Sequence, residues 1–346
     1  MESSADRQKV NEMIRNAWDM GASDLYIATG EKAWVRCGKK AIPILEECFE
    51  EADLKIMLEL FLDEEQQEKL KDSGETEFSG EAEEICRFRG SAYCFEGKYA
   101  VTLRLLSLQI PVAETLAVPS GVMELAEKEQ GILFVAGNAS SGRTTTAAAL
   151  TDWVAEKGSK MIVVLDRCME YRFDQADSMI CTREIGRDSR SYGTAIRLAV
   201  RQNVDMLFVD EIDGGETFEA VLEAAEAGIF VIAVTGGRDA QSVLEHLLQL
   251  TPQSRERIQQ RLSSVLSGVC VQRLFPRADG SGSVAAFEFL KNTEGAKNAL
   301  REGKIYQIPS IIKKSEKSGM QALDDAVFEL YMKSEITSEA MEGREI

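Results

Sequence analysis

The sequence predicts an α/β protein with two domains, on three observations. Its 346 residues exceed the roughly 100–200 residues that one domain usually holds. Two of its six prolines, Pro111 and Pro119, enclose a stretch with no sustained apolar period, which predicts a linker over residues 111–120. After this linker, short apolar runs alternate with helical patterns, which is typical of a parallel sheet. We therefore expect an N-terminal domain over residues 1–110 and a second domain over residues 121–346.

The first domain is predicted to contain helices and a β-hairpin. Apolar residues recur three and four positions apart over residues 7–20 and 53–70, as on one face of a helix. Residues 85–95 and 98–106 are predicted strands that turn at Glu96-Gly97. In the second domain, apolar runs predict the strands of a buried parallel sheet. They are residues 132–136, 161–165, 206–209 and 230–234.

Composition and charge exclude several classes of protein. The chain has 40 basic and 58 acidic side chains, a net charge of −18, which argues against non-specific binding of nucleic acids or anionic membranes. Its seven cysteines include no Cys-x-x-Cys pair and His246 is its single histidine, so we expect neither a structural zinc site nor a disulfide framework. No window reaches the roughly 18 apolar residues of a membrane span, and no apolar leader follows Met1. The sequence predicts a soluble cytoplasmic protein.

The residues after the run 132–136 match the phosphate-binding pattern GxxxxGK[ST] with one substitution. They are Gly137, Asn138, Ala139, Ser140, Ser141, Gly142, Arg143, Thr144 and Thr145. Glycines in this pattern let backbone N–H groups surround phosphate oxygens, and the following helix adds its partial positive charge. Thr144 supplies the hydroxyl that coordinates Mg²⁺, whereas Arg143 replaces the usual lysine with a planar guanidinium. We expect nucleotide phosphates to bind here; the alternative is a turn that binds no ligand.

Two carboxylates, Asp210 and Glu211, follow the apolar run 206–209. An acid at the end of such a strand can hold the water shell of Mg²⁺, and its neighbour can polarise an attacking water. Their order and distance behind the phosphate-binding loop predict a Walker B strand. We therefore expect Asp210 to contribute to the same metal site as Thr144.

Four further segments carry motifs in a characteristic order. They are Gly21-Ala22-Ser23-Asp24-Leu25, Arg183–Asp188, Glu223–Gly228 and Arg301–Ser310. These segments resemble the motifs GASDLH, REVGRD, RAAETG and REGKIHQIPS of the type II/IV secretion ATPases. The chain lacks the tetracysteine zinc insertion that assembly and export motors of this family usually carry. The resemblance therefore favours the subgroup that drives type IV pilus retraction, whose AIRNLIRE helix is similar to residues 295–302.

The resemblance implies a PAS-like N-terminal α/β domain, a RecA-like ATPase domain with a helical C-terminal tail, and a homo-hexamer or a mixed ring with a paralogue. ATP and Mg²⁺ are the implied cofactors, with Asp166 or Glu211 orienting the attacking water. Hydrolysis would drive pilus disassembly in twitching motility. The implied partner is an inner-membrane platform protein, and no nucleic acid is implied as a partner. The implied location is the cytoplasm, peripherally at the inner face of the cell membrane.

Departures from the family pattern concentrate at the chemistry. The segment EDPIE is Asp166-Arg167-Cys168-Met169-Glu170 here, so an aspartate with a shorter stem replaces the glutamate expected as general base. The segment HTN is Gly236-Gly237-Arg238, without an imidazole, and Asp213 replaces the arginine of GEMRD. Arg143 is the fourth departure. They support an alternative hypothesis: a catalytically impaired nucleotide-binding or structural subunit that modulates an intact paralogous motor. The sequence leaves ATP hydrolysis open between the two.

Arginines on the predicted hairpin are further candidates for phosphate contacts. Arg87 and Arg89 are two positions apart and lie on one face of a strand, and Arg104 lies on the second strand. The resemblance assigns Arg89 and Arg104 to nucleotide phosphates, where an arginine stabilises the charge that develops on the transferred phosphoryl group. Cross-strand pairing with the many nearby glutamates is an equal alternative.

Overall fold

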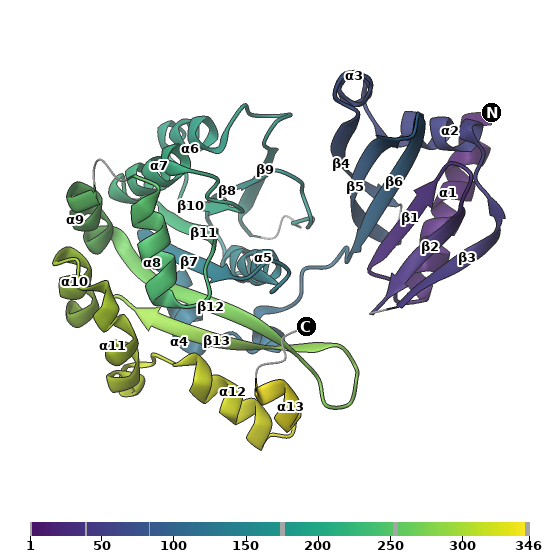
Figure 1. Cartoon of the computed structure of the whole chain (residues 1–346). Helices are drawn as coiled ribbons and strands as arrows, with labels where there is room; N and C mark the ends of the chain where they lie inside the picture. The colour runs from purple at the N-terminus through teal and green to yellow at the C-terminus, as the bar shows by residue number, and fades with distance from the viewer. Residues whose placement is uncertain (1, 39, 83, 174–176, 252–254, 343–346) are drawn as a thin grey trace. The chain divides into compact units, whose positions relative to one another are not determined.

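The structure is a computed structural model that describes residues 2–38, 40–82, 84–173, 177–251 and 255–342. The chain divides into two compact units. The first comprises Met1–Gln109 together with Cys168–Arg172, and the second comprises Ile110–Arg167 together with Phe173–Ile346. Each unit contains one sheet with helices, as Figure 1 shows, which confirms the predicted α/β class. No helix in the described part of the chain has the length and apolar character needed to cross a membrane.

The first unit is built on a six-stranded antiparallel sheet with the order β3-β2-β1-β6-β5-β4. Its strands are β1 (Asp24–Ala28), β2 (Lys32–Cys37), β3 (Lys40–Cys48), β4 (Glu75–Ala82), β5 (Cys86–Phe95) and β6 (Lys98–Leu106), and its helices are α1 (Glu2–Asp19), α2 (Glu51–Phe61) and α3 (Glu64–Ser73). One apolar core joins the helices to the sheet. The hairpin β5–β6 is confirmed: Glu96 and Gly97 make its turn with φ angles of 48° and 77°.

The single helix expected over residues 53–70 is wrong, because the structure breaks it into α2 and α3. Leu62 is extended, and Asp63 begins a new helix: its side chain accepts a hydrogen bond from the Gln66 N–H at 2.9 Å. In return, the Gln66 side chain accepts from the Asp63 N–H at 3.0 Å. This capping box starts α3 in a new direction. Residues 63–69, between Leu62 and Leu70, are all polar or charged, and this interruption of the apolar period was the signal that the sequence analysis missed.

Two glycines of the first unit lie under phenylalanine rings on the neighbouring strand. Phe78 is opposite Gly90, and Phe88 is opposite Gly80. A Cβ atom at Gly90 would lie 2.1 Å from Phe78 Cζ, and one at Gly80 would lie 2.4 Å from Phe88 Cζ. The rings therefore fill the space that side chains at these positions would take.

Substitution of Gly90 by alanine should lower the free energy of unfolding by about 1–3 kcal/mol, because the buried Phe78 ring must move to admit the methyl group. Urea unfolding followed by circular dichroism measures this. The neighbouring Ser91→Ala variant serves as the control and should stay within about 0.5 kcal/mol of the wild type. An unchanged midpoint for Gly90→Ala would contradict the tight packing.

The second unit contains a seven-stranded sheet with the order β13-β12-β7-β11-β10-β8-β9. Its strands are β7 (Gly131–Gly137), β8 (Met161–Asp166), β9 (Met179–Glu184), β10 (Met206–Val209), β11 (Phe230–Gly236), β12 (Leu266–Pro276) and β13 (Ser283–Lys291). Neighbouring strands are parallel, except that β13 is antiparallel to β12. The four predicted strands are thus confirmed as β7, β8, β10 and β11. Because they are parallel, their carboxyl ends lie at one edge of the sheet.

Helices of the second unit pack on this sheet in two groups, α4 with α5 and α6 to α9 (Figure 1). They are α4 (Ser120–Ala126), α5 (Arg143–Glu156), α6 (Tyr192–Arg201), α7 (Gly215–Glu226), α8 (Ala240–Gln249) and α9 (Arg255–Val265). Alternate residues of β7, such as Ile132 and Phe134, share one core with α6 to α9, while α4 and α5 pack against each other. The predicted helical tail is also present after β13. It consists of α10 (Glu294–Arg301), α11 (Ile308–Lys314), α12 (Leu323–Met332) and α13 (Ser338–Met341).

Candidate functional site

The predicted phosphate-binding loop connects the end of β7 to the start of α5, at the carboxyl edge of the sheet. Gly137 ends the strand where a Cβ atom would lie 2.3 Å from Ser141 Oγ and 2.5 Å from the Gln272 carbonyl oxygen. Gly142 precedes α5 with a φ angle of 81°, a conformation that favours glycine. Asn138, Ala139 and Ser140 between them are exposed. Both glycines are therefore required by the path of the loop.

Gln272 of β12 contacts this loop and the helix after it. The sequence analysis did not identify this residue. It lies level with Gly137 in the sheet, is 4% exposed, and its Oε1 accepts a hydrogen bond from the Thr146 hydroxyl at 2.5 Å. Its Nε2 lies against Gly142, 2.9 Å from where a Cβ atom would be. The contact joins residues 126 positions apart, and Gln272 directly follows the apolar run Val269–Val271 of β12. A buried polar residue after an apolar run is the sequence signal that could have indicated it.

The first residue of α5 is Arg143, whose guanidinium does not extend freely from the loop. Its Nη1 donates a hydrogen bond of 2.9 Å to the carbonyl oxygen of Thr235, near the end of β11. Thr144 follows, and its hydroxyl is hydrogen-bonded to the Asp210 carboxylate. Thr145 is the next residue and is half-buried in the first turn. The two predicted metal ligands, Thr144 and Asp210, therefore meet.

Three carboxylates gather at the ends of β8 and β10, which are parallel neighbours. Asp166 is the last residue of β8 and is 5% exposed, while Asp210 and Glu211 directly follow β10. Asp210 is hydrogen-bonded to Asp166 as well as to Thr144. Burial raises the pKa of Asp210 above its ordinary value, and the Glu211 carboxylate adds to the rise. The two hydrogen bonds and the charge of Arg143 oppose it. Glu211 itself is exposed.

Replacement of Asp210 by asparagine should stabilise the nucleotide-free protein by about 0.5–2 kcal/mol at pH 7.5, because burial disfavours the charged form of the carboxylate and an amide has no charged form. The pKa of Asp210 is raised by folding, so its contribution to stability is present below the unfolded pKa and is lost as pH rises through the folded pKa. The advantage of the variant should therefore shrink on acidification.

Urea unfolding of both proteins at pH 7.5 and pH 5 measures this difference. Asp19→Asn, on the exposed side of α1, is the matched control and should leave the free energy of unfolding unchanged at both pH values. A destabilised Asp210→Asn variant at both pH values would contradict the unfavourable burial of this carboxylate.

Four buried side-chain oxygens at this edge have no hydrogen-bond partner among the described residues. They are Ser141 Oγ, Tyr192 OH, Asp210 Oδ1 and Thr235 Oγ1. Buried polar atoms in proteins almost always have a partner, in the protein, in ordered water or in a ligand. The arrangement therefore fits a polar ligand rich in oxygen and its bound waters. An open loop of backbone N–H groups at a helix N-terminus fits the anionic phosphates of such a ligand.

Asp213, one of the four departures, contacts Arg167, which stands where the family's EDPIE segment has aspartate. The two side chains form an ion pair at 3.2 Å. The Thr217 hydroxyl donates to the other Asp213 oxygen at 2.6 Å, which fixes that carboxylate. In place of the family's HTN, Gly236 ends β11 opposite Gly137. The single histidine, His246, is an exposed residue of α8 and takes no part in the site.

Arg89 and Arg104 belong to the first unit, where they face each other across β5 and β6. Arg89 forms an ion pair with Glu77 at 3.3 Å, and Arg87 forms one with Glu81 at 3.5 Å. The cross-strand pairing considered as an alternative is therefore present for these two residues. Arg104 is exposed. The assignment of Arg89 and Arg104 to nucleotide phosphates stays a prediction.

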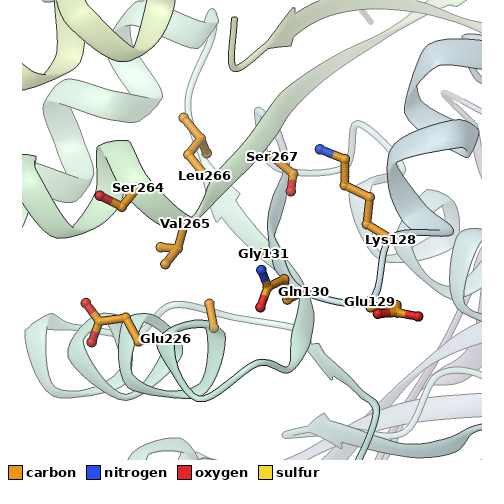
Figure 2. Close-up of a pocket in the computed structure, with 10 residues that line it drawn as sticks. Lys128, Glu129, Gln130, Gly131, Glu226, Ser264, Val265, Leu266 and Ser267 are labelled. Atoms are coloured by element: carbon orange, nitrogen blue, oxygen red, sulfur yellow. The ribbon is translucent and has the colours of Figure 1, made fainter. Parts of the chain in front are cut away.

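A cavity of about 580 Å³ lies at the other edge of the same sheet (Figure 2). Gly131 and Leu266, the first residues of β7 and β12, line it together with Lys128, Glu226 and Ser267. Strand β7 separates this cavity from the phosphate-binding loop by about 20 Å, at roughly 3.3 Å per residue. The cavity is therefore no part of the site described above.

The parallel sheet, the glycine loop before α5 and the acids after β8 and β10 define a RecA-like P-loop domain. The family profile described as "Type II/IV secretion system protein" matches residues 2–335. The chain therefore belongs to the type II/IV secretion system protein family, which confirms the resemblance noted from its motifs.

Individual relatives are similar over nearly the whole chain. The type IV pilus ATPase PilU of Pseudomonas aeruginosa is 27% identical over 329 residues, 95% of this chain and 86% of PilU. The uncharacterized protein YggR of Escherichia coli strain K12 is 31% identical over 314 residues, 90% of this chain and 94% of YggR. Among solved structures, the pilus retraction motor PilT with bound ADP is similar with a TM-score of 0.87 at 30% identity. That match covers 96% of this chain and 95% of PilT.

Proposed function

We propose that this protein is an ATP-binding ring motor of the type IV pilus retraction type, which hydrolyses ATP to drive pilus disassembly. One observation carries the proposal: buried oxygens without partners among the described residues lie in the glycine loop between β7 and α5, at the ends of β10 and β11, and at the start of α6. A nucleotide with its cation and waters supplies the partners that these oxygens lack. The bound ADP of PilT, a structure of the same fold at 30% identity, supports a nucleotide as the ligand.

Each part of the site has a role in this proposal. Backbone N–H groups of the loop from Gly137 to Gly142 would surround the phosphates, and Arg143 would contact the β- and γ-phosphates. Thr144 and Asp210 would hold Mg²⁺, because they place a hydroxyl and a carboxylate side by side and this cation prefers oxygen ligands. The cation would neutralise charge on the phosphates. Glu211 would orient the attacking water, because its carboxylate is exposed at the sheet edge whereas Asp166 is buried.

The assembly and the partners follow from the same relatives. We infer a ring of six subunits, homomeric or mixed with a paralogue, which acts on an inner-membrane platform protein and does not act on nucleic acids. The protein would then work in the cytoplasm, peripherally at the inner face of the cell membrane. The relatives named as pilus motors, PilU and PilT, support this placement.

A second candidate function is a nucleotide-binding subunit with little or no turnover that modulates an intact motor. The Arg143 side chain favours it, because the guanidinium is bonded to the Thr235 carbonyl. Gly236 also favours the non-hydrolysing subunit, because it has no side chain at the strand end opposite Gly137, where the family pattern has a histidine. Both candidates require nucleotide binding, and only the first requires rapid hydrolysis.

Nucleotide binding is tested by calorimetry and thermal unfolding with millimolar ATP and Mg²⁺. At a ligand concentration of 100 times Kd, the melting temperature should rise by about 5–10 °C. Thr144→Ala removes the hydroxyl beside Asp210 and should abolish most of the rise in melting temperature that depends on Mg²⁺. Thr115→Ala, outside the loop, should show the same rise as the wild type. No heat and no melting shift with the wild type would overturn both candidates. Phosphate release then distinguishes the two.

A further inference from the structure

Tyr192, the first residue of α6, is buried in the same core as Leu165 and Val209, the residues that directly precede Asp166 and Asp210. Its side chain is fully buried, with 0% exposure, and its hydroxyl has no hydrogen-bond partner in the described part of the chain. A phenol in an apolar core usually finds a partner for its O–H group. Packing of the aromatic ring in the core accounts for the burial of Tyr192. It does not account for the hydroxyl, because a phenylalanine would pack in the same way.

The carboxylates of the site follow the two strands on which α6 packs, β8 and β10. Burial raises the pKa of Tyr192, and the charges of Asp210, Asp166 and Glu211 raise it further, in that order. The phenol is therefore protonated and is a hydrogen-bond donor at neutral pH. Arg167 opposes the rise slightly, and its guanidinium carbon lies 5.9 Å from the centre of the Tyr192 ring.

The position of the ring is fixed from outside the site. Arg167 covers the Tyr192 ring and is itself held by its ion pair with Asp213 at 3.2 Å. Asp213 in turn accepts the Thr217 hydroxyl at 2.6 Å. This chain of contacts includes both residues that replace the family's aspartate and arginine at these positions. The hydroxyl is thus held in place by packing and charge.

A donor and an acceptor in the same cluster therefore both lack partners: Tyr192 OH and Asp210 Oδ1. They do not bond to each other. A water between them would satisfy both, because it can accept from the phenol and donate to the carboxylate. We propose that Tyr192 is a positioning residue that fixes, through this water, the orientation of the Asp210 carboxylate for Mg²⁺ bound with the nucleotide. This inference rests on the proposed function, since it needs a nucleotide site with a magnesium ion.

Tyr192→Phe tests the inference, because it removes one oxygen and keeps the ring. Loss of a partner behind a metal ligand typically lowers metal affinity or activity about 10- to 100-fold. We expect the gain in fluorescent-ATP affinity on adding Mg²⁺ to fall about tenfold or more, while affinity in excess EDTA stays within about twofold. The melting temperature of the nucleotide-free variant should equal or exceed that of the wild type, because no protein hydrogen bond is lost.

The control is Tyr331→Phe, a partly exposed tyrosine of α12, which should match the wild type in every measurement. A Tyr192→Phe variant with the wild-type response to Mg²⁺ would overturn this inference alone and leave nucleotide binding intact. A variant with an equal loss of affinity in EDTA and with Mg²⁺ would also overturn it, because the hydroxyl would then act on packing or on the nucleotide directly. A wild type without any magnesium-dependent binding would overturn it together with the proposed function.

Discussion

Replacement of Glu211 by glutamine should lower the rate of phosphate release about 10²- to 10⁴-fold, the range over which a positioned general base acts. Glu211 is the exposed carboxylate of the site, next to the buried Asp210 that would face the metal. An amide keeps the size of the side chain but accepts protons poorly. The variant should therefore bind Mg-ATP with nearly wild-type affinity. A malachite-green assay measures the turnover, and fluorescent-nucleotide titration measures the affinity.

Glu129→Gln is the matched control, since Glu129 is an exposed glutamate that lines the cavity at the opposite edge of the sheet. It should release phosphate at the wild-type rate. Equal rates for the wild type and Glu211→Gln would contradict the motor. With binding intact, that result would support the subunit that modulates a paralogue.

The parts of this fold that the sequence predicted are those set by neighbours along the chain. Strands β7, β8, β10 and β11 were predicted because each is a short apolar run buried in a parallel sheet. The loop from Gly137 to Gly142 was predicted because its path needs glycines at fixed positions. Motif spacing alone then placed Asp210 beside Thr144. Local patterns were sufficient for these elements.

Contacts between distant segments were beyond such patterns. Gln272 reaches the loop across 126 positions, and Tyr192 reaches the acids from the start of another helix. Neither residue belongs to a motif of its own, so only the folded chain brings them to the site. The break between α2 and α3 was missed for a different reason. Asp63 caps a helix by side-chain hydrogen bonds, and the polar run 63–69 that separates Leu62 from Leu70 was not taken as a helix boundary.

The replacement at Asp213 is matched by a second replacement at Arg167. Arg167 and Asp213 replace an acid and a base in two separate motifs, and here they pair with each other. The pair keeps one positive and one negative charge at these two positions, although the two are exchanged. Asp213 considered without Arg167 therefore suggests a larger change in the charge of the site than the structure has. Arg143 has no such compensating partner among the departures, because it bonds to a backbone carbonyl.

Substitution of Arg143 by lysine should raise the rate of phosphate release about 10- to 100-fold, because the guanidinium must give up its bond to the Thr235 carbonyl to contact the phosphates, whereas an ammonium is free to contact them. The guanidinium Nη1 donates to the Thr235 carbonyl at 2.9 Å, which holds the charge at the end of β11. A lysine ammonium is a compact charge with rotatable donors and no planar fork to satisfy. It can leave that carbonyl and follow the phosphate charge during transfer. Steady-state phosphate release at saturating Mg-ATP measures the change.

Arg15→Lys tests whether the same exchange has any general effect, since Arg15 is an exposed arginine of α1, in the first unit. It should leave turnover unchanged. A slower Arg143→Lys enzyme would show that the guanidinium already serves phosphoryl transfer, and that the Thr235 contact positions it. A faster one would trace reduced turnover in the wild type to one side chain, because the loop glycines, Thr144 and Asp210 are otherwise in place.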